Sequence, residues 1–156
     1  MVTRTPIIGT FDNALTDANS VITGTSGNDQ MAGYGGSDLL RGGAGNDTIV
    51  GGKGADVMVG GWGNDAFLFA RGDSGVGSGR DTITDFDRYG DDVLIFQGIS
   101  AREVTMAEVH GADGALLGVR IEYEGLGSSL GANGGAVVFL QGTSLAEIDH
   151  TDLVFR

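Results

Sequence analysis

The chain has 156 residues, of which 30 are glycine and only one is proline. A collagen-like chain needs glycine at every third position and abundant proline, so the composition excludes that class. The 21 Asp and Glu residues outnumber the 9 Lys and Arg residues, and the resulting net charge of −12 repels nucleic acid and anionic membranes and attracts cations.

Three absences narrow the class further. The chain contains no cysteine, which excludes disulfides and thiolate metal sites. No apolar run approaches the ~18 residues of a membrane-spanning helix, so no membrane span is expected. Residues 1–23, interpreted as an N-terminal lead-in strand or cap, lack the apolar stretch of a cleavable secretory signal, and export would use another signal.

A repeat of nine residues occupies residues 24–68. It runs without a gap through five blocks, 24–32, 33–41, 42–50, 51–59 and 60–68. Glycine fills the first and fourth places of every block. Aspartate fills every sixth place, at Asp29, Asp38, Asp47, Asp56 and Asp65. A large apolar residue fills every eighth place, at Met31, Leu40, Ile49, Met58 and Phe67.

Each block predicts a six-residue turn followed by a three-residue strand. In such a strand the middle, apolar side chain points inward and its two neighbours face solvent. Two blocks then make one coil of a roll, and each block stacks on the second block after it, about 4.7–4.9 Å away. The sequence therefore predicts an all-β roll with two nonapeptide repeats per coil.

The same stacking places the aspartates in rows. Asp29 is expected beside Asp47, and Asp38 beside Asp56. Like charges at that spacing destabilise a sheet unless a cation neutralises them. Calcium binds six to eight oxygens in a flexible shell, and two facing turns offer aspartate carboxylates and backbone carbonyls. The sequence thus predicts calcium between successive coils.

Calcium is also expected to be required for folding. The five inward apolar side chains are few against the conformational entropy of ordering five glycine-rich blocks. We therefore expect a roll that is largely disordered without calcium and folded with it.

The block pattern is G-G-x-G-x-D-x-U-x, where U is a large apolar residue, except that Thr25 and Tyr34 fill the second place of the first two blocks. This pattern resembles that of RTX (repeats-in-toxin) calcium-binding β-roll modules. The resemblance implies that the roll is parallel, and we expect it to hold about three to five calcium ions. It also implies that backbone carbonyls at the glycine-rich positions join the aspartates as ligands, and these positions are Gly33, Gly36, Gly42, Gly45, Gly51, Gly54, Gly60 and Gly63.

Residues 69–98 are interpreted as the segment that closes the roll. The stretches 67–74, 79–86 and 90–95 resemble the end of the roll in the C-terminal domains of serralysin-like proteases, and in modules of secreted lipases and mannuronan C-5-epimerases. This resemblance implies that Asp73, Asp81 and Asp92 close the last calcium sites. Because the loop lengths differ by about a residue, Asp91 is an alternative to Asp92.

Residues 99–156 are predicted to form a C-terminal β cap. Strands over 104–109 and 117–123 flank an Asp113-Gly114 turn, and 136–140 is predicted to be a buried strand. Ser144 and Glu147 have the spacing of a capping box on one helical turn, before a final strand over 153–155. The terminal acidic-then-apolar stretch also resembles the signal of type I secretion substrates, although Arg156 departs from that pattern.

Catalytic motifs are not expected. Residues 72–75 imitate a serine-protease nucleophile loop, but the only histidines, His110 and His150, follow it. The stretch 85–90 begins like an EF-hand loop, yet Phe96 stands where that loop needs a bidentate Glu. Trp62 and Tyr34 lie in turns, where they shield the rim of the roll or stack on sugars.

These observations favour a noncatalytic, secreted calcium-binding module that folds outside the cell and supports secretion and folding of a larger protein. Its expected partners are calcium, a covalently linked catalytic domain and a type I secretion apparatus. The alternative is a module that binds an alginate-like polysaccharide for an extracellular carbohydrate-modifying enzyme. Arg41, Lys53, Arg71, Arg80 and Arg88 are the cations available for that role.

Overall fold

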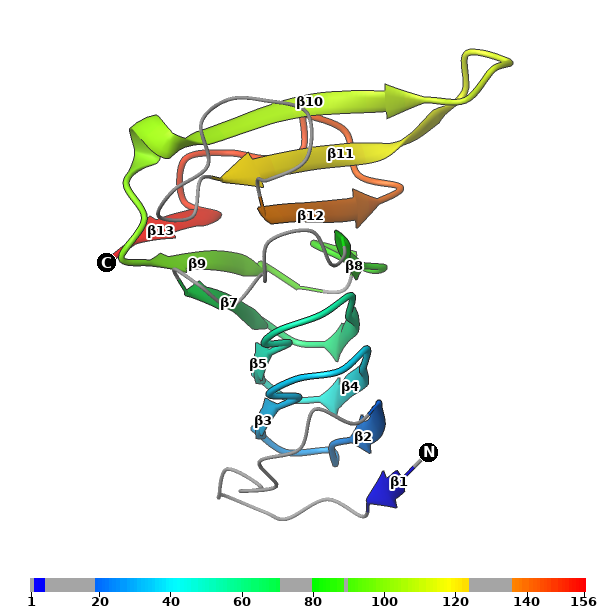
Figure 1. Ribbon diagram of the computed structural model, residues 1–156, viewed down its shortest axis with the longest axis vertical. Coiled ribbons are helices and arrows are strands. Elements are labelled where there is room, and N and C mark those ends of the chain that lie inside the picture. The colour runs from blue at the N-terminus through cyan, green and yellow to red at the C-terminus, as the bar shows by residue number, and fades with distance from the viewer. Residues whose placement is uncertain (1, 5–18, 71–79, 89, 124–135) are drawn as a thin grey trace.

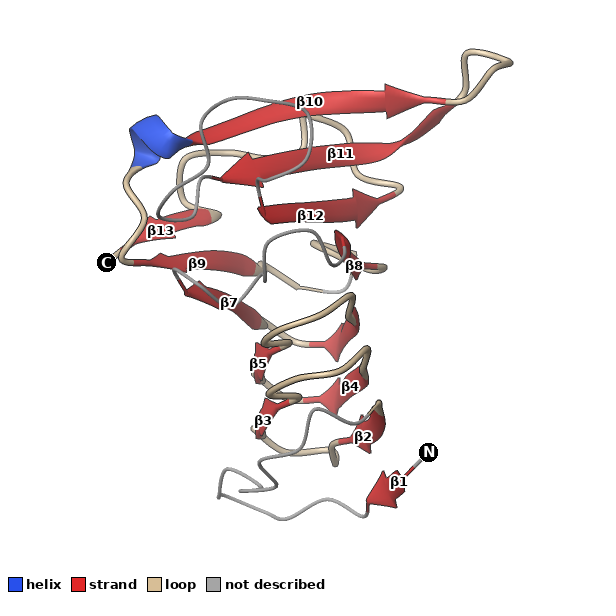
Figure 2. Ribbon diagram, viewed as in Figure 1, coloured by secondary structure: helices blue, strands red, loops and turns tan. Residues whose placement is uncertain are grey.

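The structure is a computed structural model that describes residues 2–4, 19–70, 80–88, 90–123 and 136–156. Nearly all of its regular structure is strand (Figure 2). The strands are β1 Val2–Arg4, β2 Ser20–Thr23, β3 Gln30–Ala32, β4 Leu39–Ala44, β5 Thr48–Val50, β6 Val57–Trp62, β7 Ala66–Ala70, β8 Arg80–Ile83, β9 Val93–Gln97, β10 Val104–His110, β11 Leu116–Tyr123, β12 Ala136–Gln141 and β13 Leu153–Phe155. Over the described residues, no helix is long and apolar enough to cross a membrane.

The strands form a narrow column of stacked coils with a wider antiparallel layer at its C-terminal end (Figure 1). One sheet has eight strands in the order β1-β2-β4-β6-β8-β12-β11-β10. The other has five strands in the order β13-β9-β7-β5-β3. Alternate blocks contribute to alternate sheets, and all pairings within the column are parallel. The predicted parallel β-roll with two repeats per coil is confirmed.

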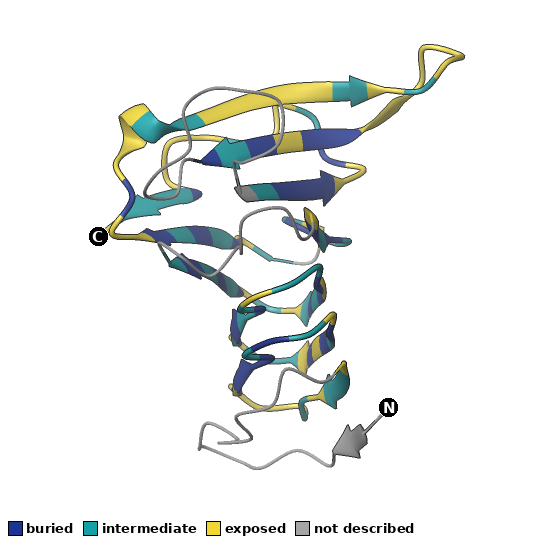
Figure 3. Cartoon of the chain, in the orientation of Figure 1, coloured by how far each residue is buried: buried dark blue, intermediate teal, exposed yellow. Residues whose placement is uncertain are grey.

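The apolar eighth places stack in the expected register. Met31 lies opposite Ile49, and Ile49 opposite Phe67, in the five-stranded sheet. Leu40 lies opposite Met58 in the eight-stranded sheet. Four of these five side chains are completely buried, while their strand neighbours are more exposed (Figure 3). The roll therefore has a core only one side chain deep from each strand.

The ladder of the eight-stranded sheet extends before the first complete repeat, because β1 pairs in parallel with β2. Strand β2 pairs in parallel with β4, and this places Ile22 opposite Leu40. Ile22 packs against the buried core. The block 15–23 thus has an apolar eighth place without the glycines or the aspartate of the later blocks.

The C-terminal part extends both sheets of the roll. Strands β10 and β11 form the predicted hairpin, and β11 pairs antiparallel with β12. Strand β12 then pairs in parallel with β8, and β13 pairs in parallel with β9. An aromatic cluster fills the junction between roll and cap, formed by Phe69, Phe96, Tyr123 and Phe155 with ring centroids 5.5–6.1 Å apart.

One local prediction in the cap was wrong. Ser144 and Glu147 make the capping-box contacts, with the Ser144 N–H donating to Glu147 Oε2 at 2.6 Å, but the residues form a turn and not a helix. A single turn carries the full cost of helix nucleation and gains few hydrogen bonds. The same Ser-x-x-Glu pattern at Ser100 and Glu103 does open a short 3-10 helix, η1 Ala101–Glu103, which the sequence analysis missed.

Candidate calcium sites

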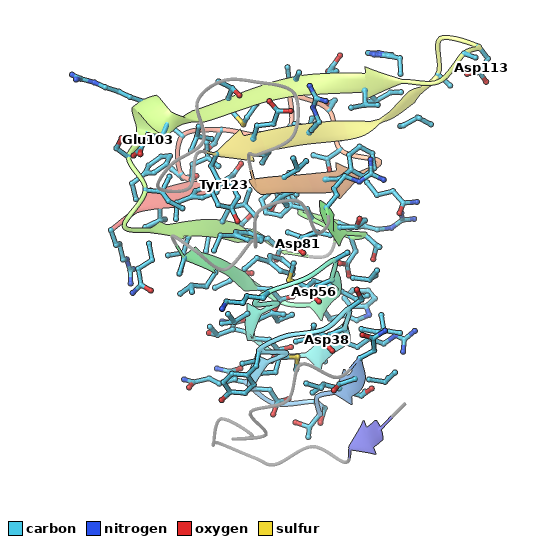
Figure 4. The ribbon with its side chains drawn as sticks, viewed as in Figure 1. Asp38, Asp56, Asp81, Glu103, Asp113 and Tyr123 are labelled. Atoms are coloured by element: carbon cyan, nitrogen blue, oxygen red, sulfur yellow. The ribbon has the colours of Figure 1, made fainter. Side chains whose placement is uncertain are left out.

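The repeat aspartates are buried although they carry a charge. Their side chains lie on the inner side of the turns, and Asp47, Asp56 and Asp65 are each at most 1% exposed. Figure 4 shows Asp38, Asp56 and Asp81 one above the other along the roll. The predicted rows of aspartates are therefore present in the folded chain.

One oxygen of each carboxylate is used to hold the coils together. The N–H of Asp29 donates to Asp47 Oδ1 at 2.8 Å, and the N–H of Asp47 donates to Asp65 Oδ1 at 2.8 Å. The second row repeats this, with the N–H of Asp38 donating to Asp56 Oδ1 at 2.8 Å. Such bonds to a carboxylate are stronger than neutral ones. They tie each coil to the next at the level of the charged side chain.

The other oxygen has no partner in the protein. The Oδ2 atoms of Asp38, Asp47, Asp56 and Asp65 are buried and accept no hydrogen bond. A buried, unpaired carboxylate oxygen is costly unless a cation or a donor meets it. Asp29 differs, because its Oδ2 accepts bonds from the Thr25 N–H at 2.6 Å and the Thr25 hydroxyl at 2.9 Å.

The first-place glycine leaves space beside each of these oxygens. A methyl group placed on Gly42 would overlap Asp47 Oδ2 and would stand 2.5 Å from the Gly60 carbonyl oxygen. The carboxylate of one block and a carbonyl of the second block after it thus face one another across a gap that only glycine leaves open. Gly33, Gly51 and Gly60 lie in the same way beside the aspartate of their own block.

The fourth-place glycines allow the backbones of neighbouring turns to pack closely. Gly36, Gly45, Gly54 and Gly63 have φ between 104° and 131°, a region that L side chains rarely adopt. At Gly54 a methyl group would collide with the Gly36 carbonyl of the preceding coil. Glycine is therefore needed there for backbone geometry, whether or not its carbonyl is a ligand.

Burial disfavours the charged form of these carboxylates. It raises the pKa of Asp47 to about 6, with a lowering hydrogen bond from the Asp29 N–H and raising contributions from the charges of Asp65 and Asp29. Burial likewise raises the pKa of Asp56 to about 6 and that of Asp92 to about 7. A bound cation would reverse this effect by favouring ionised carboxylates.

Of the residues predicted to close the last calcium sites, Asp81 and Asp92 continue the rows of aspartates. The N–H of Asp56 donates to Asp81 Oδ1 at 3.0 Å, and the N–H of Asp65 donates to Asp92 Oδ1 at 2.9 Å. Both rows therefore continue past the last repeat. Asp92 is buried whereas Asp91 is exposed, so Asp92 holds the row position. Asp73 lies outside the described residues.

A second ladder, which the sequence did not lead us to predict, joins asparagines of successive coils. Asn46 donates its N–H to Asn28 Oδ1 at 2.8 Å, and Asn64 donates its N–H to Asn46 Oδ1 at 3.0 Å. These bonds run from the later block to the earlier one, opposite to the aspartate bonds. Asparagine in the fifth place at intervals of 18 residues was the available signal.

The donor set fits calcium better than a transition metal. In the part of the chain that the structure describes, no three His, Cys, Asp or Glu side chains converge as a metal cluster. Each gap instead offers a carboxylate oxygen, joined at Gly33 and Gly42 by a backbone carbonyl oxygen, and these are the hard ligands that calcium takes. The half-exposed His110 lies 3.7 Å from Glu108 and not near the roll aspartates.

Comparison with known families agrees with this geometry. A family model described as "RTX calcium-binding nonapeptide repeat (4 copies)" matches residues 16–49 and, in a second overlapping match, residues 33–67. This part of the chain is therefore similar to RTX calcium-binding nonapeptide repeats. The match begins within the block 15–23, whose strand β2 pairs with β4 of the first matching repeats. Comparison with curated proteins finds no match.

Two solved structures share the fold of this RTX roll and its cap. One is the AlgE6R3 subunit of the Azotobacter vinelandii mannuronan C5-epimerase, with 28% identity, a TM-score of 0.61, and coverage of 97% of this chain and 86% of that chain. The other is the AlgE6R2 subunit of that epimerase, with 29% identity, a TM-score of 0.54, and coverage of 86% of this chain and 91% of that chain. The similarity therefore extends beyond the repeats into the cap.

Proposed function

We propose that this chain is a noncatalytic module whose RTX roll folds when calcium binds between its coils. The observation that carries the proposal is the set of four buried Oδ2 atoms, on Asp38, Asp47, Asp56 and Asp65, that have no partner in the protein. Each of them faces the space left by a first-place glycine of its own block.

The protein supplies the geometry of each proposed site. Bound calcium would supply the positive charge that compensates the buried carboxylate. The N–H bond to Oδ1 fixes the carboxylate, as at Asp47, and leaves Oδ2 directed at the gap beside Gly42. The Gly60 carbonyl oxygen approaches from the next coil of the same row. Calcium binding would therefore stabilise the stacking of coils and not just one turn.

A calcium titration followed by circular dichroism tests this proposal. We expect calcium depletion to reduce the β signal to that of the cap, and added calcium to raise it to a plateau. Magnesium is the control ion, because it demands a smaller octahedral shell and gives up its water reluctantly. An unchanged β spectrum in excess chelator would refute the proposal.

We further propose that folding takes place outside the cell, in a secreted protein. Cytosolic calcium is scarce, so the chain would remain unfolded and competent for export, and external calcium would fold it. The RTX repeats support this, because they are typical of secreted proteins. Export of the chain by a type I apparatus with and without residues 150–156 tests the C-terminal signal, and undiminished export of the shortened chain would refute it.

A polysaccharide-binding role is the second candidate. The two similar structures are subunits of an enzyme that acts on mannuronan. On the eight-stranded sheet, Phe139 pairs with Thr82 on one side and Arg120 on the other, and the Arg80 guanidinium lies 4.9 Å from the Phe139 ring. Exposed cations beside a ring could contact a polyuronate. Calorimetry with alginate oligosaccharides in calcium tests this, and no heat of binding would refute it.

A further inference from the structure

The outer face of the five-stranded sheet carries an apolar row. Its strands lie in the order β13-β9-β7-β5-β3, so β7 is the central strand (Figure 1). Along each strand, residues that point into the core alternate with residues that point away from it. One outward residue of each strand lies at the same level of the sheet, directly after a paired inward residue. These five residues are Ala32, Val50, Leu68, Ile95 and Val154.

The rest of this face carries no charge on its described strand positions. The row before the apolar row contains Gln30, Thr48, Ala66 and Val93, and the row after it contains Ala70 and Gln97. Arg156 lies beyond the end of β13, at the rim. Charged residues make up 19% of the chain, and the outer face of the eight-stranded sheet carries Arg41, Arg80 and Arg120. The two outer faces therefore differ in character.

The apolar row is partly open to solvent. Val50, Leu68, Ile95 and Val154 are half-buried, although they lie on the side of the sheet away from the core. Five strands about 4.8 Å apart, each about five residues long, give this face a footprint of about 400 Å². An apolar patch of that size on a folded protein is often a binding surface.

Charge favours a second copy of the chain as the occupant of this face. Each copy has a net charge of −12, so two copies repel one another wherever their acidic surfaces meet. The outer face of the five-stranded sheet lets them meet without bringing like charges together. A twofold contact needs a patch that is complementary to itself. A row that is apolar from end to end meets this condition, and its central residue, Leu68, then meets Leu68 of the other copy.

We propose that two copies of this chain associate through the outer faces of their five-stranded sheets, with Leu68 at the twofold axis. Two footprints together amount to about 800 Å², below the roughly 1,200–2,000 Å² of stable complexes, so the dimer is weak and dissociates readily. The row crosses three coils of the roll, at β3, β5 and β7, and is complete only when these coils are stacked. The proposal therefore rests on the proposed function, and the dimer should form only in calcium.

Sedimentation equilibrium of the full chain in calcium, from about 10 µM to about 1 mM, tests the proposal. We expect the average mass to rise with concentration from that of one copy toward that of two, and to stay at one copy in chelator. Leu68→Lys and Leu68→Glu each place two like charges at the centre of the contact, so each should weaken the dimer at least tenfold. Val57→Lys is the matched control, because Val57 is a 38% exposed residue of the eight-stranded sheet.

An equimolar mixture of Leu68→Lys and Leu68→Glu separates loss of the contact from loss of folding. Opposite charges meet at the axis in the mixed dimer, so the mixture should associate more strongly than either variant alone. Circular dichroism in calcium should show the full β signal for both variants. Unchanged association of Leu68→Lys, or a mixture no stronger than its components, would overturn the proposal.

The natural chain distinguishes the failure of this proposal from the failure of the proposed function. A chain that gains β signal in calcium but keeps the mass of one copy at about 1 mM would overturn the dimer and leave calcium-dependent folding intact. A chain whose β signal does not respond to calcium would overturn both.

Discussion

At the scale of the residue, the two oxygens of the sixth-place aspartate have two tasks. The first is to accept a backbone hydrogen bond, and the second is to attract a cation. Oδ1 of Asp47 accepts the N–H of Asp29 in the preceding coil, and Oδ2 is buried without a partner. Asparagine can keep the first task, because its side-chain oxygen still accepts a hydrogen bond. It cannot keep the second, because it lacks the charge that attracts a cation.

Asp47→Asn should therefore weaken calcium binding more than it weakens the fold. At calcium about 100-fold above the dissociation constant, the loss of one site should lower the calcium-dependent stabilisation by about 2.7 kcal/mol. In calcium-depleted buffer the variant should be at least as stable as the natural chain, because a buried unpaired charge is gone. Urea unfolding in calcium measures the first effect, and the residual β signal in calcium-depleted buffer measures the second. Asp113→Asn is the control, and an unchanged calcium increment in Asp47→Asn would rule out this ligand.

The glycines in the fourth place differ in what they tolerate. Gly54 has φ of 131°, and a methyl group there would meet the backbone of Gly36. Gly27, in the same place of the first block, has no other atom closer than 3.9 Å to a methyl group. Gly54→Ala should destabilise the calcium-bound roll by about 1–3 kcal/mol or more, whereas Gly27→Ala should be nearly neutral. Equal unfolding midpoints for the two variants would contradict this reason for the repeat.

At the scale of the element, the strands of the roll are too short to hold themselves together. Strands β3 and β5 have only three residues each, and each contributes one fully inward side chain. The buried aspartate ladder and the exposed asparagine ladder add hydrogen bonds between coils in opposite directions. Stability of one coil therefore depends on its neighbours, as in other repeat proteins.

The charge of the aspartate rows makes this stability dependent on pH. Burial raises the pKa of Asp47 and Asp56 to about 6 and of Asp92 to about 7, so the calcium-free roll binds protons more tightly than the unfolded chain does. The resulting stabilisation is complete below the unfolded value of about 3.9 and is lost as the pH rises through about 6 to 7.

In calcium-depleted buffer the roll should thus become more stable as the pH is lowered from 7.5 to 5. The further stabilisation by calcium should shrink over the same range, because protons and calcium compete for the carboxylates. The β signal in circular dichroism, recorded in calcium-depleted buffer at the two pH values, measures the folded fraction of the roll. A calcium-free β signal that falls on acidification would contradict this prediction.

At the scale of the whole molecule, the two ends have different sources of stability. The roll buries unpartnered carboxylate oxygens beside a core one side chain deep. The cap buries Val119, Ile121, Val138 and Leu140 beside the aromatic cluster around Phe96. An apolar core of this kind needs no cation to compensate charge.

Removal of calcium should therefore open the roll before the cap. In chelator, amide hydrogen exchange should become fast in 30–68 while amides of β11 and β12 remain protected, since their exchange requires unfolding of the cap core. Exchange measured by mass spectrometry on peptides from both regions tests this. Simultaneous loss of protection in both regions would show one cooperative unit instead.

The strict register of glycine, aspartate and apolar residues was enough to predict the roll, the inward side chains from Met31 to Phe67 and the rows of aspartates. Because the nine-residue pattern occurs five times without a gap, a roll with two repeats per coil is the arrangement in which every eighth-place apolar residue points inward. The hairpin around Gly114 and the strand 153–155 were predicted for local reasons of turn chemistry and apolar runs.

The tertiary structure alone decided how these pieces meet. It showed that Asp92 and not Asp91 continues the row, that β12 joins the roll beside β8, and that Val154 extends the outer apolar row of the five-stranded sheet. Each of these depends on pairing between segments far apart in the chain, for which the sequence has no period. The sequence by itself determined which unit repeats, because local spacing fixes the register of identical units. The tertiary structure determined how the roll ends, because the long-range pairing of unlike strands leaves no regular pattern in the sequence.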